Sequence, residues 1–515
     1  MRQTFLACVA ALGSAAPFSI ATAQNAPVGA PTQGQAAWSL PNPSLGTVNE
    51  NNNAQTTARS GPFANPTPGT IVIHIGARVN TGFKATWSSV DQRFVTAPSA
   101  TSFAAGQGIN GTGVVKLAPY ALNSYARLYF SADAMATNGL RYGAAIELRQ
   151  NFAGAISSNT SSNASTYSST SSIFVRRAFA YVAGDNWGIL RTGNADGIIG
   201  IFDNGVTTFQ YLPTNNLQNG DDYAALTPGN ATVPFFFLSG AGNEYANTKV
   251  VYLSPQFGGV DFGLQYAPNT FNGYAGFNTF GAVGPSLTGT GIGTGNACSV
   301  ANSGCATLSS SPGILDGARI LNQTAVGARY QGKFGVIGVL AYAAYEFSGH
   351  VSYTGSTAAA VLGNTVPGGT YNGSYDGLNF GNGGVAITFG QFTVGGNVIG
   401  GRLNGQLALA PQHGAPEVAY MVGAKYVNGR FVIGVAAERG DYQGSVNLTG
   451  LSQRRGQAID VGVGYTAAPG FTVYAEYQYD TLYQGGFNFV TSAIGSVANN
   501  NARSQGLLVG NVVNF

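Results

Sequence analysis

The sequence predicts an all-β fold: a transmembrane, antiparallel, up-and-down β-barrel of about sixteen strands. Three observations support it. Apolar and polar residues alternate in segments from about residue 70 to the C-terminus, short turns and long polar loops take strictly alternate places between the segments, and charged residues make up only 8% of the chain. An alternating segment is a strand with one apolar and one polar face. An even number of such strands, with every short turn at one end, is typical of outer-membrane barrels.

The low charge is the compositional part of this argument. A soluble protein carries about a quarter of charged residues, and the deficit fits an outer surface that faces lipid. The mature chain has no apolar run of about 18 residues, so a membrane could be spanned only by a closed barrel. Composition by itself fits a secreted all-β protein, such as a solenoid or an adhesin, equally well. The formal net charge of +3 gives no strong field, so no nucleic-acid partner is expected.

The N-terminus is predicted to be a secretory signal peptide, residues 1–23. Arg2 precedes a mostly apolar stretch at 5–20, and the small residues Ala21 and Ala23 form a cleavage site before Gln24. Residues 24–68 are rich in Pro, Asn, Gln and Gly without a period, and we expect a flexible periplasmic leader there. The barrel is then expected to occupy residues 69–515.

The alternation fixes the expected strands in order. The first, about 69–80, places Ile71 and Ile73 on one face and His74 and Arg78 on the other. The others are expected at about 120–134, 140–150, 173–183, 187–194, 248–254, 260–267, 319–331, 334–347, 377–390, 392–403, 417–427, 430–442, 457–467, 471–483 and 502–515.

The connections between these strands define the two ends of the barrel. The Asn-Gly pair at 138–139 favours a type I′ hairpin, and another short turn is expected at 332–333. All short turns and both termini lie at one end, which in such barrels is periplasmic. The long connections lie at the other end, and one of them is expected to hold Arg454 and Arg455.

Aromatic residues gather near the expected strand ends, as in the two girdles of a membrane barrel. The general preference of aromatic residues for strands accounts for some of them. The tyrosines concerned are Tyr181, Tyr252, Tyr266, Tyr330, Tyr345, Tyr420, Tyr426, Tyr465, Tyr477 and Tyr479.

Two cysteines, Cys298 and Cys305, remain after signal cleavage, and both lie in one loop rich in Gly, Ser and Thr. In an oxidising compartment they could form a local disulfide. The alternative is two free thiols. Two cysteines alone do not complete a metal site, and no cofactor is expected.

Four stretches resemble the Gram-negative general porins. They are RAFAYVAGDNWGILRTGNADG at 177–197, NTKVVYLSP at 247–255, FGGVDFGLQY at 257–266 and the C-terminal GLLVGNVVNF. The resemblance implies a sixteen-stranded, usually homotrimeric barrel in the outer membrane, in contact with its lipid and lipopolysaccharide. It also implies passive diffusion of small hydrophilic solutes and ions, and Phe515 as a signal for the barrel-assembly machinery.

The resemblance also implies an inward-folded constriction loop, which by loop order is 195–246. This loop contains acidic residues and no Lys or Arg, so an acidic loop would face a basic wall and create a transverse field. The alternative is that the arginines pair with nearby carboxylates, as Arg149 could with Glu147 or Asp133. The acidic loop residues are Asp196, Asp203, Asp221, Asp222 and Glu244, and the expected basic wall residues are Arg78, Arg127, Arg141, Arg149, Arg191 and Lys249.

An apolar run at 234–238 lies in the same loop. It is expected either to fix the loop to the inner wall or to form a trimer contact, and we favour the first. The histidines, His74, His350 and His413, show no metal spacing, and no Gly-x-Ser-x-Gly motif occurs. An enzyme is therefore not expected.

Two other functions stay open on the sequence. One is a structural or adhesive surface barrel, which the Ser/Thr/Gly-rich loops at 151–171 and 268–318 would suit. The other is a substrate-selective porin, for example for sugars, in which inward tyrosines such as Tyr125 and Tyr129 would stack on the solute. Ion flux separates a pore from an adhesin, and block of conductance by sugar separates a selective porin from a general one.

Overall fold

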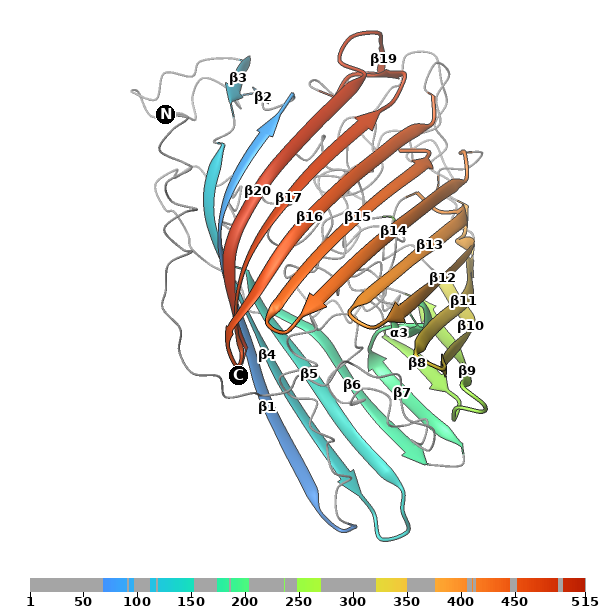
Figure 1. The fold of residues 1–515 in the computed structure, drawn as a ribbon. Coiled ribbons are helices and arrows are strands. Elements are labelled where there is room, and N and C mark those ends of the chain that lie inside the picture. Colours follow the sequence, from blue (N-terminus) through green and yellow to red (C-terminus); the bar gives the residue numbers. More distant parts are fainter. Residues whose placement is uncertain are drawn as a thin grey trace, which may run out of the picture.

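Sixteen antiparallel strands close into one barrel (Figure 1), so the predicted fold class is confirmed. The structure is a computed structural model that describes residues 68–89, 92–96, 112–116, 119–151, 174–184, 187–202, 236, 248–269, 321–349, 376–404, 410, 414–444, 452–489 and 494–514. The barrel strands are β1 (Ile71–Ser88), β4 (Tyr120–Met135), β5 (Arg141–Asn151), β6 (Phe174–Gly184), β7 (Gly188–Asn194), β8 (Thr248–Leu253), β9 (Val260–Asn269), β10 (Leu321–Phe334), β11 (Ile337–Gly349), β12 (Asn379–Phe389), β13 (Phe392–Arg402), β14 (Glu417–Asn428), β15 (Phe431–Tyr442), β16 (Arg454–Ala468), β17 (Phe471–Tyr483) and β20 (Asn501–Asn514).

Each barrel strand pairs with the barrel strands that come before and after it in the chain, and β1 closes the ring by pairing with β20. The short connections all lie at one end, as expected. Two small hairpins and one helix complete the described elements. They are β2 (Gln92–Thr96) with β3 (Thr112–Lys116), β18 (Gly486–Phe487) with β19 (Ile494–Ser496), and α3 (Ile198–Phe202). No helix in these described ranges is long and apolar enough to cross a membrane.

Three predicted boundaries were wrong. β1 runs on to Ser88, because residues 81–88 continue the alternation, with Lys84 buried inside and Trp87 exposed outside. The turn predicted at 332–333 lies instead after Phe334, where Gly335 has a left-handed φ of 62°. Residues 332–333, predicted as the turn, belong to β10 and pair with β11.

Arg454 and Arg455, predicted in a loop, are the first two residues of β16. They pair with Tyr442 and Asp441 of β15 in an unbroken antiparallel register. The pairing extends this far because Arg454 is buried on the inner face, whereas Arg455 is exposed on the outer face. An alternation of this kind is what a strand requires, although both residues carry charge.

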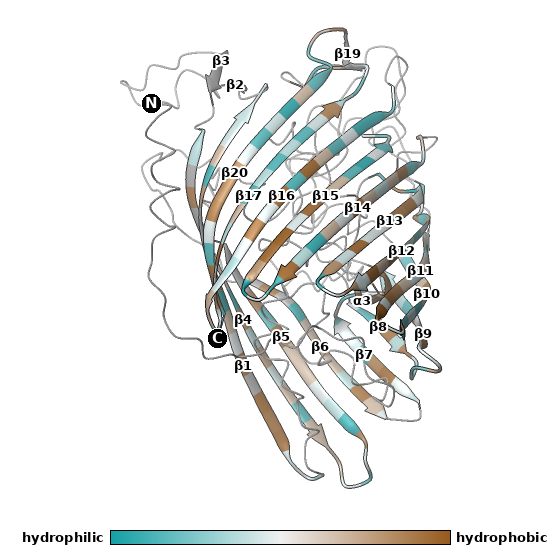
Figure 2. Ribbon diagram, in the orientation of Figure 1, coloured by the Kyte–Doolittle hydropathy of each residue, from teal (hydrophilic) through white to brown (hydrophobic). Residues whose placement is uncertain are grey.

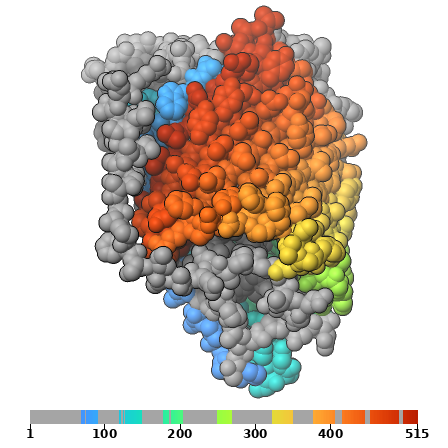
Figure 3. Space-filling model, in the orientation of Figure 1, coloured from blue at the N-terminus to red at the C-terminus, as the bar shows by residue number. Residues whose placement is uncertain are grey.

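Hydrophilic and hydrophobic residues alternate along the barrel strands (Figure 2), so the two faces of the barrel differ in polarity. Large apolar side chains on the outer face are exposed, among them Leu122 at 81% and Val422 at 57%. Charged and amide side chains face inward and are buried. Figure 3 shows the outer surface over β12–β20, from the same side as Figure 1. The apolar outer face suits contact with lipid, and the polar inner face suits a water-filled interior.

Aromatic rings line the outer face near the short turns. Phe392 lies 4.7 Å from Tyr426, and Phe431 lies 4.8 Å from Tyr465, between ring centroids. Tyr181 was expected in a girdle and is instead buried inside the barrel. Its side chain points to the inner face of β6, where its hydroxyl donates a hydrogen bond. A position near a strand end does not show which face a residue points to.

Candidate functional site

The connection after β7 enters the barrel through α3. All five residues of α3 are buried, and the helix packs against β9, β10 and β11 (Figure 1). Ile198 and Phe202 lie in an apolar cluster with wall residues such as Leu253. Gly263 of β9 makes room for them, because a Cβ there would collide with Ile198 and lie 3.1 Å from Phe202. The absence of a side chain at Gly263 therefore lets α3 pack closely against the barrel wall.

Polar groups of the wall hold both ends of this segment. Before the helix, Lys249 donates to the carbonyl of Ala195 at 2.9 Å. Gln265 accepts a hydrogen bond from the amide of Ile198 at 2.8 Å. These contacts satisfy backbone groups that a short buried helix would otherwise leave without a partner. The start of the loop thus has a defined position inside the barrel.

Arg329 of β10 holds the C-terminal end of α3. Its guanidinium binds Asp261 of β9 through two hydrogen bonds, of 2.6 and 3.1 Å. It also donates to the carbonyl of Ile201 at 3.2 Å and lies 4.9 Å from the ring centroid of Phe202. Arg329 and Asp261 are both buried. A bidentate pair of this kind gives direction as well as energy.

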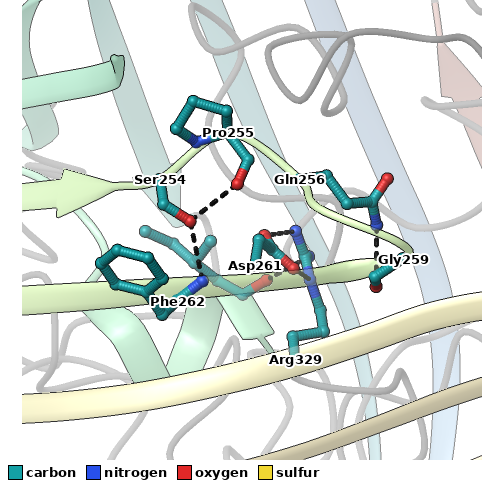
Figure 4. A network of polar contacts seen from close by, with 8 residues as sticks. Ser254, Pro255, Gln256, Gly259, Asp261, Phe262 and Arg329 are labelled. Carbon is teal, nitrogen blue, oxygen red and sulfur yellow. Dashed lines mark hydrogen bonds and ion pairs between the residues drawn. The ribbon is translucent and has the colours of Figure 1, made fainter. Parts of the chain in front are cut away.

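Asp261 follows the tight turn between β8 and β9, and this turn positions it for Arg329 (Figure 4). The Ser254 hydroxyl donates to the carbonyl of Pro255 at 2.8 Å and accepts from the amide of Phe262 at 3.0 Å. The Gln256 amide donates to the carbonyl of Gly259 at 3.1 Å. The turn is therefore closed by its own side chains, next to the residue that binds Arg329.

Phe236, later in the same connection, contacts another part of the wall. Its side chain is fully buried, and its ring meets that of Tyr442 edge-on, with centroids 5.3 Å apart. A Cβ on Gly440 of β15 would lie 2.5 Å from the Phe236 ring, so the glycine forms the notch that holds it. β15 lies seven strands from β8 around the sixteen-stranded ring. The β7–β8 connection therefore touches nearly opposite walls.

The predicted basic residues lie on β1, β4, β5, β7 and β8. Arg78, Arg127 and Arg149 stand in one cross-strand row of three neighbouring strands. Like charges that face each other across neighbouring strands repel one another. The structure does not describe the Arg149 side chain. The predicted residues with buried side chains are Arg78, Arg127, Arg141, Arg191 and Lys249.

Arg177 of β6 was not among the predicted residues, yet it is central to this side of the interior. It donates to Glu147 of β5 at 2.7 Å and to Asp196 at 2.9 Å, and all three side chains are buried. Asp196, predicted as a loop acid facing the wall, is thus bound to the wall directly. The other predicted loop acids, Asp203, Asp221, Asp222 and Glu244, lie outside the described residues, as do Cys298, Cys305 and Phe515.

Tyr181 and Asp133 form a further contact on this side. The Tyr181 hydroxyl donates to the Asp133 carboxylate across β5, where Gly143 stands between them in register. A Cβ on Gly143 would meet the Tyr181 ring, so only glycine leaves this path open.

Buried carboxylates lie on another arc of the ring, and sequence reasoning missed them. They occupy the inner face of β14–β17, where Lys425 and Arg454 are the basic residues that accompany them. Each lies at a polar position of an alternating strand, so the alternation alone would indicate that it faces inward. The carboxylates are Glu417, Glu438, Asp460, Glu476 and Asp480.

A closed antiparallel barrel with an apolar outer face, a charged interior and a segment folded inside it defines the class of outer-membrane pore proteins. The family model of the Gram-negative porins matches residues 104–483, and the chain belongs to this family. It is an outer-membrane porin, through which small hydrophilic solutes and ions diffuse passively.

Solved structures of porins resemble the chain at low identity. The anion-selective porin from Comamonas acidovorans is 13% identical, with 87% of this chain and 100% of that chain covered and a TM-score of 0.46. A loop-deletion mutant of OmpT, an outer membrane protein of Vibrio cholerae, is 12% identical, with 86% and 99% covered and a TM-score of 0.43. A mutant of the Rh. blastica porin is 13% identical, with 86% and 100% covered and a TM-score of 0.40. No curated protein matches the chain.

Proposed function

We propose that charge separation inside the barrel selects the solutes that pass. The basic side is made by β1 and β4–β8, and the acidic side by β14–β17. The observation that carries the proposal is the position of these strands on two separate arcs of the ring, with β9–β13 between them on one side and β20 on the other. Opposite charges on two sides of a narrow aqueous path create a transverse field, which orients polar solutes and discriminates between ions.

Removing the acidic side is expected to shift the pore toward anions. In the variant Glu438→Gln/Asp460→Asn/Glu476→Gln/Asp480→Asn, the basic strands keep their charge and cations lose their attraction. The reversal potential in a tenfold KCl gradient should move toward the chloride limit, on the order of 10 mV on a scale of ~59 mV. Asp441→Asn, on the outer face, is the matched control. An unchanged reversal potential in the folded quadruple variant would remove these residues from the conduction path.

The loop acids carry a separate prediction. We propose that Asp221 and Asp222 lie at the constriction, because their loop begins inside the barrel at α3 and touches β15 at Phe236. Asp221→Asn/Asp222→Asn should then shift the reversal potential in the same direction. The shift should add to that of the quadruple variant if both sets line one path. If the double variant leaves selectivity intact, these two acids lie away from the eyelet.

The remaining parts of the proposal concern assembly. The protein would be exported by residues 1–23, recognised through Phe515 by the barrel-assembly machinery, and inserted beside lipopolysaccharide as a homotrimer. Residues 24–68 would form a periplasmic leader, and Cys298 and Cys305 a loop disulfide. No catalytic step and no cofactor enter this function. Single-channel recording in planar bilayers tests it: conductance steps in groups of three support a trimeric pore, and silence from folded protein refutes an open one.

A further inference from the structure

We propose that Arg454, on the inner face of β16, is a positioning residue for the pore: it couples the β18–β19 hairpin to the β7–β8 connection inside the barrel. The contacts run from Phe487 and Phe489 at the hairpin through Arg454 and Tyr442 to Phe236 of the connection. The inference concerns how the connection is held in place, so it does not depend on the charge selectivity proposed for the interior.

Arg454 has a defined place at the long-loop end of the barrel. It is the first residue of β16, and its side chain is fully buried. Gly444, which follows β15, makes room for it, because a Cβ there would lie 2.6–2.8 Å from three atoms of the arginine side chain. The φ of Gly444 is 77°, in the left-handed region that favours glycine. The backbone therefore approaches Arg454 more closely than another residue would allow.

The β18–β19 hairpin binds the guanidinium group of Arg454. Nε of the arginine donates to Oε1 of Gln484 at 2.8 Å. Its Cζ lies 4.6 Å from the ring centroid of Phe487 and 5.2 Å from that of Phe489. Both rings are buried, and they meet edge-on with their centroids 5.1 Å apart. A guanidinium group against desolvated rings is held more strongly than one at an exposed ring, so the hairpin and the arginine are expected to move together.

Hydrogen bonds keep this hairpin ordered and tie it to β15. The side-chain amide of Asn500 donates to the carbonyl of Phe487 at 2.7 Å and to that of Ser496 at 2.9 Å. The side-chain amide of Gln484 donates to the carbonyl of Gln443, directly after β15, at 3.1 Å. The rings that contact the arginine therefore belong to a hairpin with its own internal support.

Tyr442 of β15 extends the path from Arg454 into the barrel. The two residues are partners in the sheet register, and both side chains point inward and are fully buried. Partners in an antiparallel register have neighbouring side chains. The Tyr442 ring also meets Phe236 edge-on at 5.3 Å, beside the notch formed by Gly440 on the same face of β15. A displacement of the Tyr442 ring therefore changes the point at which the connection is anchored.

The path begins at a surface that lies outside the barrel. Val497, next to β19, is 96% exposed, and β19 lies at the top of the barrel in Figure 1, away from the C-terminus. Packed side chains couple two sites when an element between them has two arrangements. Here the arrangements are the connection anchored at Phe236 and the connection released from β15. A change at the hairpin is expected to alter the balance between them through Arg454.

Single-channel recording of the full-length protein in planar bilayers tests this coupling. Phe487→Leu/Phe489→Leu keeps apolar side chains at the hairpin but removes both rings from Arg454. Transitions to lower conductance levels should become about tenfold more frequent, as expected for the loss of desolvated cation–π contacts. Arg454→Gln should behave in the same way, and Arg454→Lys, which keeps a cation at the rings, should restore most of the quiet current. Arg455→Gln, the next residue on the outer face, is the matched control and should conduct like the unmodified protein.

The combination with Phe236→Ala separates coupling from a local structural role. Once Phe236 no longer anchors the connection, Arg454 has nothing to position, so Phe236→Ala/Arg454→Gln should show the transition rate of Phe236→Ala alone. Rates that multiply in the combined variant would overturn the proposal, because Arg454 would then stabilise the end of the barrel independently. Quiet channels in Phe236→Ala or in folded Arg454→Gln, or equal noise in Arg455→Gln, would also overturn it. If Arg454→Gln does not fold, Phe487→Leu/Phe489→Leu takes its place in the combination.

Discussion

Replacing Arg329 with alanine is expected to destabilise the folded barrel by about 3–5 kcal/mol and to release α3 from the wall. The substitution leaves the buried carboxylate of Asp261 without its bidentate partner, in a place where its exposed fraction is 1%. It also removes the donor to the carbonyl of Ile201 and the cation over the Phe202 ring. A buried charge that loses its partner keeps its full desolvation cost, so the loss exceeds what the pair contributes to stability.

Urea unfolding of the refolded protein, followed by tryptophan fluorescence, measures this loss. Arg329→Lys should recover part of it, because lysine keeps the charge but cannot bind both carboxylate oxygens in the same planar geometry. Arg430→Ala, at an exposed turn, should change stability by less than about 0.5 kcal/mol. If Arg329→Ala unfolds at the same urea concentration as the unmodified protein, the Arg329–Asp261 pair does not stabilise the fold. The position of α3 then depends on its apolar cluster alone.

The second large effect is expected from Phe236→Ala, and it should appear in the current rather than in unfolding. A buried Phe→Ala change costs about 3–5 kcal/mol of local packing. The barrel strands are held together by their backbone hydrogen bonds, which the substitution does not change. The lost packing energy therefore weakens only the contact between the loop and β15. A freed loop samples more positions across the pore. Single-channel recordings should show increased open-channel noise and frequent transitions to lower conductance levels.

Gly440→Val should reproduce this behaviour, because its side chain would occupy the notch that now holds the Phe236 ring. Phe257→Ala is the matched control, since Phe257 is 64% exposed at the β8–β9 turn. Quiet channels of unmodified conductance in both Phe236→Ala and Gly440→Val would show that this contact does not position the loop.

Much of the barrel followed from the sequence because its determinants are local. A strand in a membrane barrel must alternate, and this period of two is legible in each segment without knowledge of its neighbours. All sixteen strands were therefore found, most to within three residues. The errors occurred where charge or glycine masked the period, at 81–88 and at Arg454 and Arg455. There the pairing with an adjacent strand, rather than the composition, decides where a strand begins or ends.

The interior was less predictable, since its contacts join residues far apart in the chain. The sequence indicated which residues face inward on the early strands, including Arg78 and Arg127, but could not tell that Arg177 binds both Glu147 and Asp196. Nor could it indicate that Gly440 forms a notch for Phe236, two hundred residues earlier. A glycine in a strand has many causes, and only a close approach by another side chain distinguishes them.

The sequence by itself thus determined the class of fold, the strand order and the polarity of both faces, because each depends on alternation and turn spacing along the chain. The resemblance to porins came from four short stretches of the sequence. The tertiary structure alone decided which charges meet and where the inward segment touches the wall. These depend on barrel closure and register, which bring together strands that the chain keeps apart.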